Sequence, residues 1–420
     1  MQQRRRVVPR AVAAAVIALA LVGAGFGAGV ASDRAGVLPG SGVYVPPPGV
    51  APSFGVFWEA WRLVQEHYVN RAAVDPTEMT YGAIQGMLDS LGDPGHTRFL
   101  SPTELRAEEE TLAGQLEGIG AEVGTRNGQV VVVAPIPGSP AQRAGLRAGD
   151  AIVRVDGRDV SGMTLEQVIT LVRGPAGTSV TLTVLHRGDA EFTDVTITRA
   201  KIAVPSVSWA RVPGTTVAHI LIGQFAERAT DELVAALSAA RAGGATAVVL
   251  DLRDDPGGLR DEAIGVASQF LREGVVLIEQ DAGGQRSTFP VKPGGVATDV
   301  PLVVLVDYGT ASSAEIVAGA LQDHHRAMLV GATTFGTGTV LSTYNLSDGS
   351  AILLGTAEWL TPNGREIWHH GITPDVRVEL PPDAVPLTPN EETSLTPQQL
   401  QASHDTQLLR ALQELGQGAP

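Results

Sequence analysis

Residues 301–341, PLVVLVDYGTASSAEIVAGALQDHHRAMLVGATTFGTGTVL, join an apolar run to a helical pattern through a short polar turn. The run 301–306 predicts a buried strand, and the segment from Glu315 onward predicts a helix. Ser312 falls at the turn, where a side chain is exposed at the end of a sheet and helix-start N–H groups can stabilise an oxyanion. Serine is also a favoured helix cap. These residues alone favour the cap, so the choice depends on the rest of the chain.

Composition limits the function classes. The chain has 420 residues, enough for two or three domains. Its formal charge of −15 argues against nucleic acid as a partner. The absence of cysteine excludes disulfides, thiol catalysis and cysteine-ligated metal, and it fits an oxidising exterior. The sequence has neither a P-loop nor a His-Glu-x-x-His motif, so no nucleotide or metal cofactor is expected.

The first 32 residues predict a signal peptide or membrane anchor. Four arginines precede an uncharged run, 11–31, that is long enough to span a bilayer. Its length favours an uncleaved anchor with the bulk of the chain outside. We therefore expect an exported, extracytoplasmic protein, in the periplasm or at the cell surface, held at the membrane by this segment. Residues 33–52 are rich in glycine and proline and predict a tether.

Residues 53–114 predict a helical N-terminal region. Apolar side chains recur there at helical spacing and are expected to pack in a core: Phe54, Phe57, Trp58, Trp61, Val64 and Tyr68. Two helix starts are predicted by a cap, a first-turn proline and a glutamate three positions after the cap, at 75–78 and 101–104.

Residues 115–201 change to short strands and turns and resemble a PDZ domain. The resemblance rests on an ordered set of motifs: Glu117-Gly-Ile-Gly120, Gly138-Ser-Pro-Ala141, Ala144-Gly-Leu146, Gly149-Asp-Ala-Ile-Val153 and Val155-Asp-Gly157. PDZ domains bind a peptide C-terminus by strand addition, and N–H groups of a glycine-rich loop receive its carboxylate. Here that loop is Gly118, Ile119 and Gly120, and protein C-terminal tails with an apolar last residue are the expected ligands.

Residues 202–380 predict an α/β core. Apolar runs at 217–222 and 247–252 read as strands, and 231–242 reads as a helix closed by glycines. The second strand ends in a turn whose glycine pair, Gly257 and Gly258, can present free N–H groups, although plain turn chemistry also explains it. Residues 381–420 predict a linker followed by an amphipathic helix at 405–415.

From about residue 57 to 412 the chain resembles the carboxyl-terminal processing (tail-specific) serine peptidases. The motifs follow the family's order: Ser90-Leu-Gly-Asp-Pro94, Phe99-Leu-Ser-Pro102, Asp251-Leu-Arg253, Pro256-Gly-Gly-Leu259, Ala311-Ser312, Glu315 to Asp323, Thr334-Phe-Gly336, Leu346 to Ser350, Leu360 to Arg365 and Gly371 to Asp375. An HtrA-type protease would instead place its catalytic domain before the PDZ domain.

The resemblance implies an α/β peptidase core of crotonase/ClpP-like ββα units, an inserted β-rich PDZ domain and a helical N-terminal region. Ser312 matches the family's nucleophile, and N–H groups near Gly258 and Ser313 would form the oxyanion hole. The implied function is an exported serine endopeptidase whose PDZ groove holds the substrate tail and which needs no cofactor. The natural substrate and any homo-oligomer are left open.

The sequence departs from the family at its general base. The family's lysine is Thr337 here, and the glutamine four residues on is Leu341. Threonine has no basicity near neutral pH, and the chain's two lysines, Lys201 and Lys292, lie in no matching motif. A serine hydroxyl needs a base to become a good nucleophile. Either another group serves as base, or the chain is a non-catalytic homologue that binds protein C-termini as an adaptor.

Histidine suits base work near neutral pH. Four histidines near family motifs are candidates: His324, His325, His369 and His370. Glu358 is a further candidate that could orient a histidine. Each of these histidines taken singly is more often a surface or packing residue than a catalytic one.

Overall fold

The computed structural model describes residues 51–93, 96–126, 128–136, 138–189, 191–381 and 384–416. The predicted anchor, 1–32, and nearly all of the tether lie outside these residues. In the part that is described, no helix is long and apolar enough to cross a membrane. The chain divides after Thr80 into two compact units.

The N-terminal helical segments are α2 (Ala51–His67), the 3-10 turn η1 (Arg71–Ala73) and α3 (Pro76–Asp89). The aromatic stripe of α2 was expected to be buried, and this expectation is wrong. The side chains of Phe54, Trp58 and Tyr68 are about half exposed, at 46%, 59% and 50%. The rings of Phe57 and Trp58 pack edge-to-face at 5.0 Å, so the aromatic residues contact one another along the helix.

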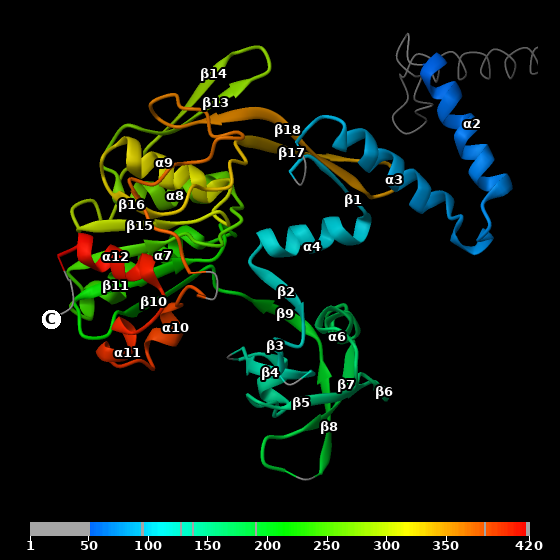
Figure 1. Cartoon of the computed structure of the whole chain (residues 1–420), viewed down its shortest axis with the longest axis horizontal. Coiled ribbons are helices and arrows are strands. Elements are labelled where there is room, and N and C mark those ends of the chain that lie inside the picture. Colours follow the sequence, from blue (N-terminus) through cyan, green and yellow to red (C-terminus); the bar gives the residue numbers. More distant parts are fainter. Residues whose placement is uncertain are drawn as a thin grey trace, which may run out of the picture. The chain divides into compact units, whose positions relative to one another are not determined.

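The core of the second unit is a six-stranded sheet (Figure 1). Its order is β10 (Val207–Arg211), β11 (Val217–Ile222), β12 (Ala247–Asp251), β15 (Leu302–Val306), β16 (Met328–Gly331) and β19 (Val376–Arg377). β10 is antiparallel to β11 and the other neighbours are parallel. Unbroken apolar runs such as Leu302–Val306 form its central strands because both faces of a parallel sheet are buried.

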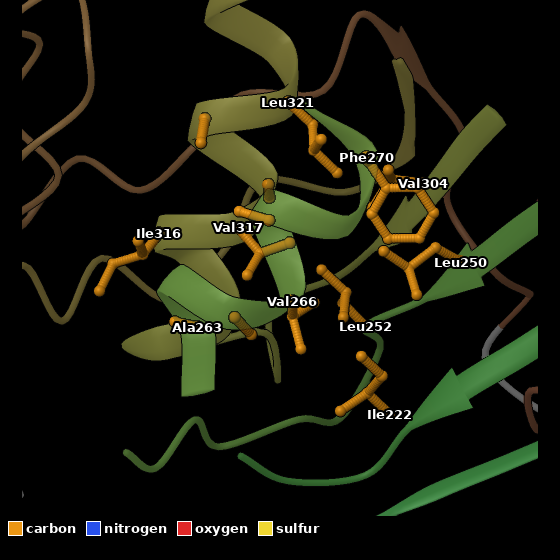
Figure 2. Close-up of a cluster of buried hydrophobic side chains, with 14 of the residues drawn as sticks. Ile222, Leu250, Leu252, Ala263, Val266, Phe270, Val304, Ile316, Val317 and Leu321 are labelled. Atoms are coloured by element: carbon orange, nitrogen blue, oxygen red, sulfur yellow. The ribbon is translucent and has the colours of Figure 1, made fainter. Parts of the chain in front are cut away.

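Helices cover both faces of this sheet. They are α7 (Ala229–Ala242), α8 (Arg260–Phe270) and α9 (Ser313–Asp323) on one face and α12 (Thr406–Glu414) on the other. Leu250 and Val304 point into the first cluster with Phe270 and Val317, as Figure 2 shows. The preceding residue of β12, Val249, packs on the opposite face of the sheet, in the cluster that includes α12. The C-terminal helix was predicted and packs on the core through Leu408, Ala411 and Leu412.

A second, antiparallel sheet follows the order β1 (Arg98–Leu100), β18 (Ala351–Leu360), β13 (Val275–Asp281) and β14 (Arg286–Pro290), with β17 (Thr339–Asn345) also paired to β18. β1 comes just before α4 (Pro102–Leu112), whose predicted capping box forms between Ser101 and Glu104. The register of β17 on β18 shifts between Val340 and Leu341. This sheet brings the segment before β1 to the strand that follows Thr337.

The predicted PDZ segment has its own core cluster. Its elements are β3 (Ala121–Arg126), β4 (Gln129–Pro135), α5 (Pro140–Arg143), β5 (Ala151–Val155), β6 (Arg158–Asp159), α6 (Leu165–Val172), β7 (Ser179–Leu185) and β8 (Phe192–Thr198). The strands that lead in and out, β2 (Gln115–Gly118) and β9 (Ala200–Ala203), pair with each other antiparallel. The segment is therefore an insertion whose two ends lie side by side.

A buried group of charged residues ties the C-terminal segment to the core sheet. We call it the charge cluster: His219, Asp251, Arg253, Glu392 and Asp405. The ring of His219 bonds Glu392 through Nδ1 at 2.7 Å and Asp251 through Nε2 at 3.0 Å. Glu392 ends the short helix α10 (Pro389–Glu392), which precedes α11 (Pro397–Gln401). Segments far apart in sequence are thus held together by paired opposite charges.

Candidate active site

Ser312 lies at the N-terminus of α9 in an unusual backbone conformation, with φ 51° and ψ −116°. Ordinary capping serines here, such as Ser101 and Ser139, have extended backbone with φ of −60° and −75°. A positive φ at a non-glycine residue costs on the order of 1–3 kcal/mol and persists only where its surroundings enforce it. The conformation of Ser312 is therefore more than helix capping requires.

The turn before Ser312 is fixed by side-chain hydrogen bonds. Asp307 Oδ1 accepts the N–H groups of Gly309 at 2.9 Å and of Asp254 at 3.0 Å. The hydroxyl of Thr310 donates to the carbonyl of Leu252 at 2.8 Å. These bonds join the ends of β12 and β15, so the serine is held at the carboxyl edge of the parallel sheet.

The glycine pair after β12 packs directly against the serine. A Cβ on Gly257 would lie 2.7 Å from Ser312 Cβ, and one on Gly258 would lie 2.4 Å from the carbonyl oxygen of Phe225. Both glycines also have positive φ, 96° and 140°. The hydroxyl of Ser313 donates to the carbonyl of Gly258 at 2.9 Å. Only glycine allows this approach of the two turns.

The predicted oxyanion donors have free N–H groups. Within the described residues, neither the N–H of Gly258 nor that of Ser313 donates a hydrogen bond. Ser313 is the first residue of α9, where helix geometry leaves N–H groups without an intrahelical acceptor. Ser313 follows Ser312 in sequence, and Gly258 follows Gly257, which packs against Ser312. They are the donors available to a negative oxygen at this turn.

Buried Glu315 connects the serine to the loop of Thr337. Its carboxylate accepts the N–H groups of Ser312 at 3.0 Å, Gly336 at 2.7 Å and Thr337 at 2.9 Å, and also the hydroxyl of Thr334. Burial raises the pKa of Glu315, and these hydrogen bonds oppose that rise. The carboxylate thus fixes the loop against the N-terminus of α9.

Thr337 occupies the position predicted for the missing lysine. It is buried, and its Oγ1 accepts the N–H of Ser312 at 3.0 Å. Its hydroxyl therefore binds the backbone of the serine without offering a base. Leu341 lies four residues further along β17, opposite Gly355 of β18. An aliphatic side chain at this position provides no polar group for the site.

The structure separates the four candidate histidines into two pairs. His324 and His325 lie at the far end of α9, and an 11-residue helix is about 16 Å long. His324 Nε2 donates to the carbonyl of Val275 at 2.8 Å. His369 and His370 are exposed, and the N–H of His369 donates to the carbonyl of Gly336 at 2.9 Å. Only the second pair adjoins the Thr337 loop, and within the described residues none of the four bonds Ser312.

The structure also brings a fifth histidine, His96, to this region. Its Nδ1 hydrogen-bonds Thr339 Oγ1, two residues after Thr337. Burial lowers its pKa below the ordinary value, while the nearby charge of Asp93 opposes this shift. His96 was not among the histidines predicted from the sequence, all of which follow Ser312. A signal was available, because His96 lies between two of the quoted motifs, 90–94 and 99–102.

The predicted peptide-binding loop borders an apolar groove. A cavity of about 200 Å³ is lined by Gly118, Ile119 and Gly120 on one side and by Ile152, Val168 and Val172 on the other. The opposite wall includes one face of α6. No group of acidic or histidine side chains in the described residues could hold a metal ion.

A strained serine between two glycine-dependent turns, with free N–H groups beside it, is an arrangement typical of serine hydrolases, and a groove lined by the predicted peptide-binding loop lies in the same chain. Sequence comparison agrees: residues 216–378 match peptidase family S41 and residues 131–185 match the PDZ domain. The chain belongs to the S41 carboxyl-terminal processing serine peptidases.

Two relatives establish the family. The chain is 39% identical over 327 residues to the carboxyl-terminal-processing protease of Synechocystis sp., covering 76% of each. It is 36% identical over 325 residues to carboxy-terminal processing protease CtpA of Bacillus subtilis, covering 77% of this chain and 68% of the relative. The crystal structure of an S41 protease from Bacteroides fragilis has a TM-score of 0.50 at 16% identity, over 85% of this chain and 96% of that one, which supports the fold alone. The predicted fold class and family are confirmed.

Proposed function

We propose that this chain is an exported endopeptidase in which the Ser312 hydroxyl attacks a peptide carbonyl. The observation that carries the proposal is the backbone of Ser312, held at φ 51° by turns that only glycine permits. An adaptor would not need this conformation. The N–H groups of Gly258 and Ser313 would receive the oxyanion, and preorganised donors of this kind lower the barrier to acyl transfer.

The PDZ groove would select the substrate. Its floor is apolar, and the loop Gly118–Ile119–Gly120 offers backbone N–H groups to a terminal carboxylate. We therefore assign protein tails with an apolar last residue as ligands. The arginine-rich start and apolar run of residues 1–32 support export with retention at the membrane.

A second function, a non-catalytic adaptor for protein tails, is favoured by Thr337. Its hydroxyl accepts the Ser312 N–H where the family's lysine would act. A chain with an intact groove but no base would bind tails without cutting them. The two functions predict the same affinity for tails and different products.

The test is cleavage of a synthetic unstructured polypeptide with an apolar last residue by the full-length parent, Ser312→Ala and Thr337→Lys. We expect the parent to cleave it and Ser312→Ala to lower kcat at least about 10⁴-fold, because the nucleophile is gone. Tail binding, measured by fluorescence anisotropy, should be equal in both. Binding without cleavage by the parent, with activity gained in Thr337→Lys, would establish the adaptor instead.

A further inference from the structure

We propose that His96 is the general base that activates Ser312 in place of the missing lysine, an assignment that rests on the proposed peptidase function. His96 lies just before β1, and its Nδ1 bonds the hydroxyl of Thr339, the first residue of β17. Two residues earlier, Thr337 accepts the N–H of Ser312. Two residues of chain span at most about 7 Å. His96 and Ser312, more than 200 residues apart in sequence, therefore contact the same short segment, 337–339.

The hydrogen bond at Nδ1 leaves the other ring nitrogen available. Asp93 Oδ2 lies 3.8 Å from Nδ1, and this negative charge favours a proton there. We therefore assign the tautomer in which Nδ1–H donates to Thr339 and Nε2 carries the free lone pair. Within the described residues, Nε2 of His96 has no hydrogen-bond partner. A base oriented through one nitrogen and free at the other is the arrangement of serine hydrolase triads.

The residues around His96 leave space for its ring. They also include acidic side chains. A Cβ on Gly355 of β18 would lie 3.4 Å from both Asp93 Oδ2 and Thr339 Cβ, so the absence of a side chain there lets the groups converge. Glu358 is the direct partner of Thr339 across the antiparallel strands, and directly paired side chains lie on the same face. Asp93 is thus positioned to stabilise a positive charge on the ring, and Glu358 lies on the face of β18 that Thr339 shares.

The surroundings suit a group that must be neutral before reaction. Burial is the main cause that lowers the pKa of His96, and Arg98 acts in the same direction. Asp93 opposes both, and Glu358 faces the region from β18. A neutral imidazole at pH 7 can accept a proton, and the carboxylate of Asp93 favours the imidazolium once it forms. His369 and His370 are exposed and lack this setting.

The chemistry balances with water as the only co-reactant. Nε2 takes the proton from Ser312 Oγ as Oγ bonds the carbonyl carbon, and the carbonyl oxygen becomes an oxyanion. The imidazolium returns the proton to the leaving nitrogen as the C–N bond breaks, which leaves an acyl-serine. Water then attacks, His96 takes its proton and gives it to Oγ, and a carboxylic acid is released. No His96–Ser312 bond exists in the described residues, and such bonds often tighten only with substrate bound.

The experiment compares the full-length parent with His96→Gln, His96→Gly and the exposed control His67→Gln on the same polypeptide. We expect His96→Gln to lower kcat at least about 100-fold with little change in KM. The acidic limb of the pH profile of kcat/KM should disappear with the histidine. Added imidazole should restore part of the activity of His96→Gly, and His67→Gln should match the parent. Thermal unfolding of each variant shows whether it is folded.

The outcomes separate the base from the peptidase. If Ser312→Ala is inactive but His96→Gln keeps the parent's kcat and pH profile, the base assignment fails and the peptidase function stands. If the parent cleaves nothing, both fail, because a competent base should make the chain active. Loss of activity in His96→Gln, with no rescue of folded His96→Gly by imidazole, would assign His96 a structural role and overturn the proposal.

Discussion

Titratable groups are buried both in the charge cluster and around Ser312, but their pKa values shift toward the charged form in the first and toward the neutral form in the second. The groups around Ser312 are Glu315, His96, which contacts the segment 337–339, and Asp255, whose carbonyl accepts the N–H of Ala311. Burial would lower the pKa of His219, but hydrogen bonds and charges from Asp251 and Glu392 outweigh it and raise the pKa to about 9. Around Ser312 burial prevails: it lowers the pKa of His96 and raises that of Asp255 and Glu315. The pKa shifts toward the charged form where an oppositely charged partner lies within hydrogen-bonding distance, and toward the neutral form where none does.

The two directions of the pKa shift suit different roles. Groups shifted toward the charged form stay charged at neutral pH, so the charge cluster can hold the C-terminal segment to the core. Groups shifted toward neutrality are easier to protonate and deprotonate near neutral pH, which is what proton transfer to and from a substrate needs. The same residue type, histidine, therefore holds segments together in one region and is suited to proton transfer in the other.

Removal of the histidine from the charge cluster should have the largest effect. His219→Ala leaves Glu392 buried without its positive partner. Breaking a buried pair in this way costs about 3–5 kcal/mol of unfolding free energy. Chemical denaturation would measure the loss, with His67→Ala as an exposed control. A loss below about 1 kcal/mol would mean that the pairing contributes little to stability.

The pH dependence of stability should differ in sign between the two histidines. His219 has a folded pKa of about 9 against 6.5 in the unfolded chain, so its contribution of about 3 kcal/mol is complete below pH 6.5 and lost as pH rises through 9. For His96, whose folded pKa is lowered, the contribution is present above pH 6.5 and lost as pH falls. Unfolding free energies from pH 5 to 9.5 would measure this, with His219→Gln flattening only the alkaline decline. An alkaline decline that remains in this variant would contradict the assignment to His219.

The smallest expected effect is a gain in stability from a substitution near Ser312. Asp255 is buried, and its Oδ2 has no hydrogen-bond partner in the described residues. Burial raises the folded pKa of Asp255. The contribution of this shift to the free energy of unfolding is therefore complete below the unfolded pKa of 3.8 and is lost as the pH rises through the folded pKa. Asp255→Asn should therefore stabilise the fold by about 1–2 kcal/mol at pH 8 and by less at pH 4.5, measured by denaturant unfolding. Destabilisation at both pH values would show that Oδ2 has a partner that an amide cannot replace.

Local sequence patterns predicted the strand and the helix on either side of Ser312. The apolar run 302–306, the turn and the helix from Ser313 form as expected because each is encoded within a few neighbouring residues. The capping box at Ser101 and the C-terminal helix were predicted for the same reason. The helical spacing of the α2 aromatics correctly gave a helix, but spacing alone does not say whether a face finds a partner, and here it stays largely exposed.

Long-range contacts could not be predicted in this way. The bond of His96 to Thr339 joins residues 243 positions apart, and the bonds that Glu315 makes to the Thr337 loop depend on two turns meeting. The sequence gives the motifs on either side of His96 but not the strand pairing that brings it to β17. By contrast, the distance of His324 from Ser312 follows from the length of α9 and was available from the sequence.

The paired strands β2 and β9 have a consequence for engineering. Gln115 lies opposite Ala203, and Gly118 opposite Ala200, so the chain leaves and re-enters at neighbouring positions. Paired antiparallel residues are about 4.5–5.5 Å apart. A foreign tail-recognition module whose termini lie that close could therefore be spliced between these strands without stretching the core. Under the proposed function, the segment that selects the substrate would then be exchanged without altering the turn that holds Ser312.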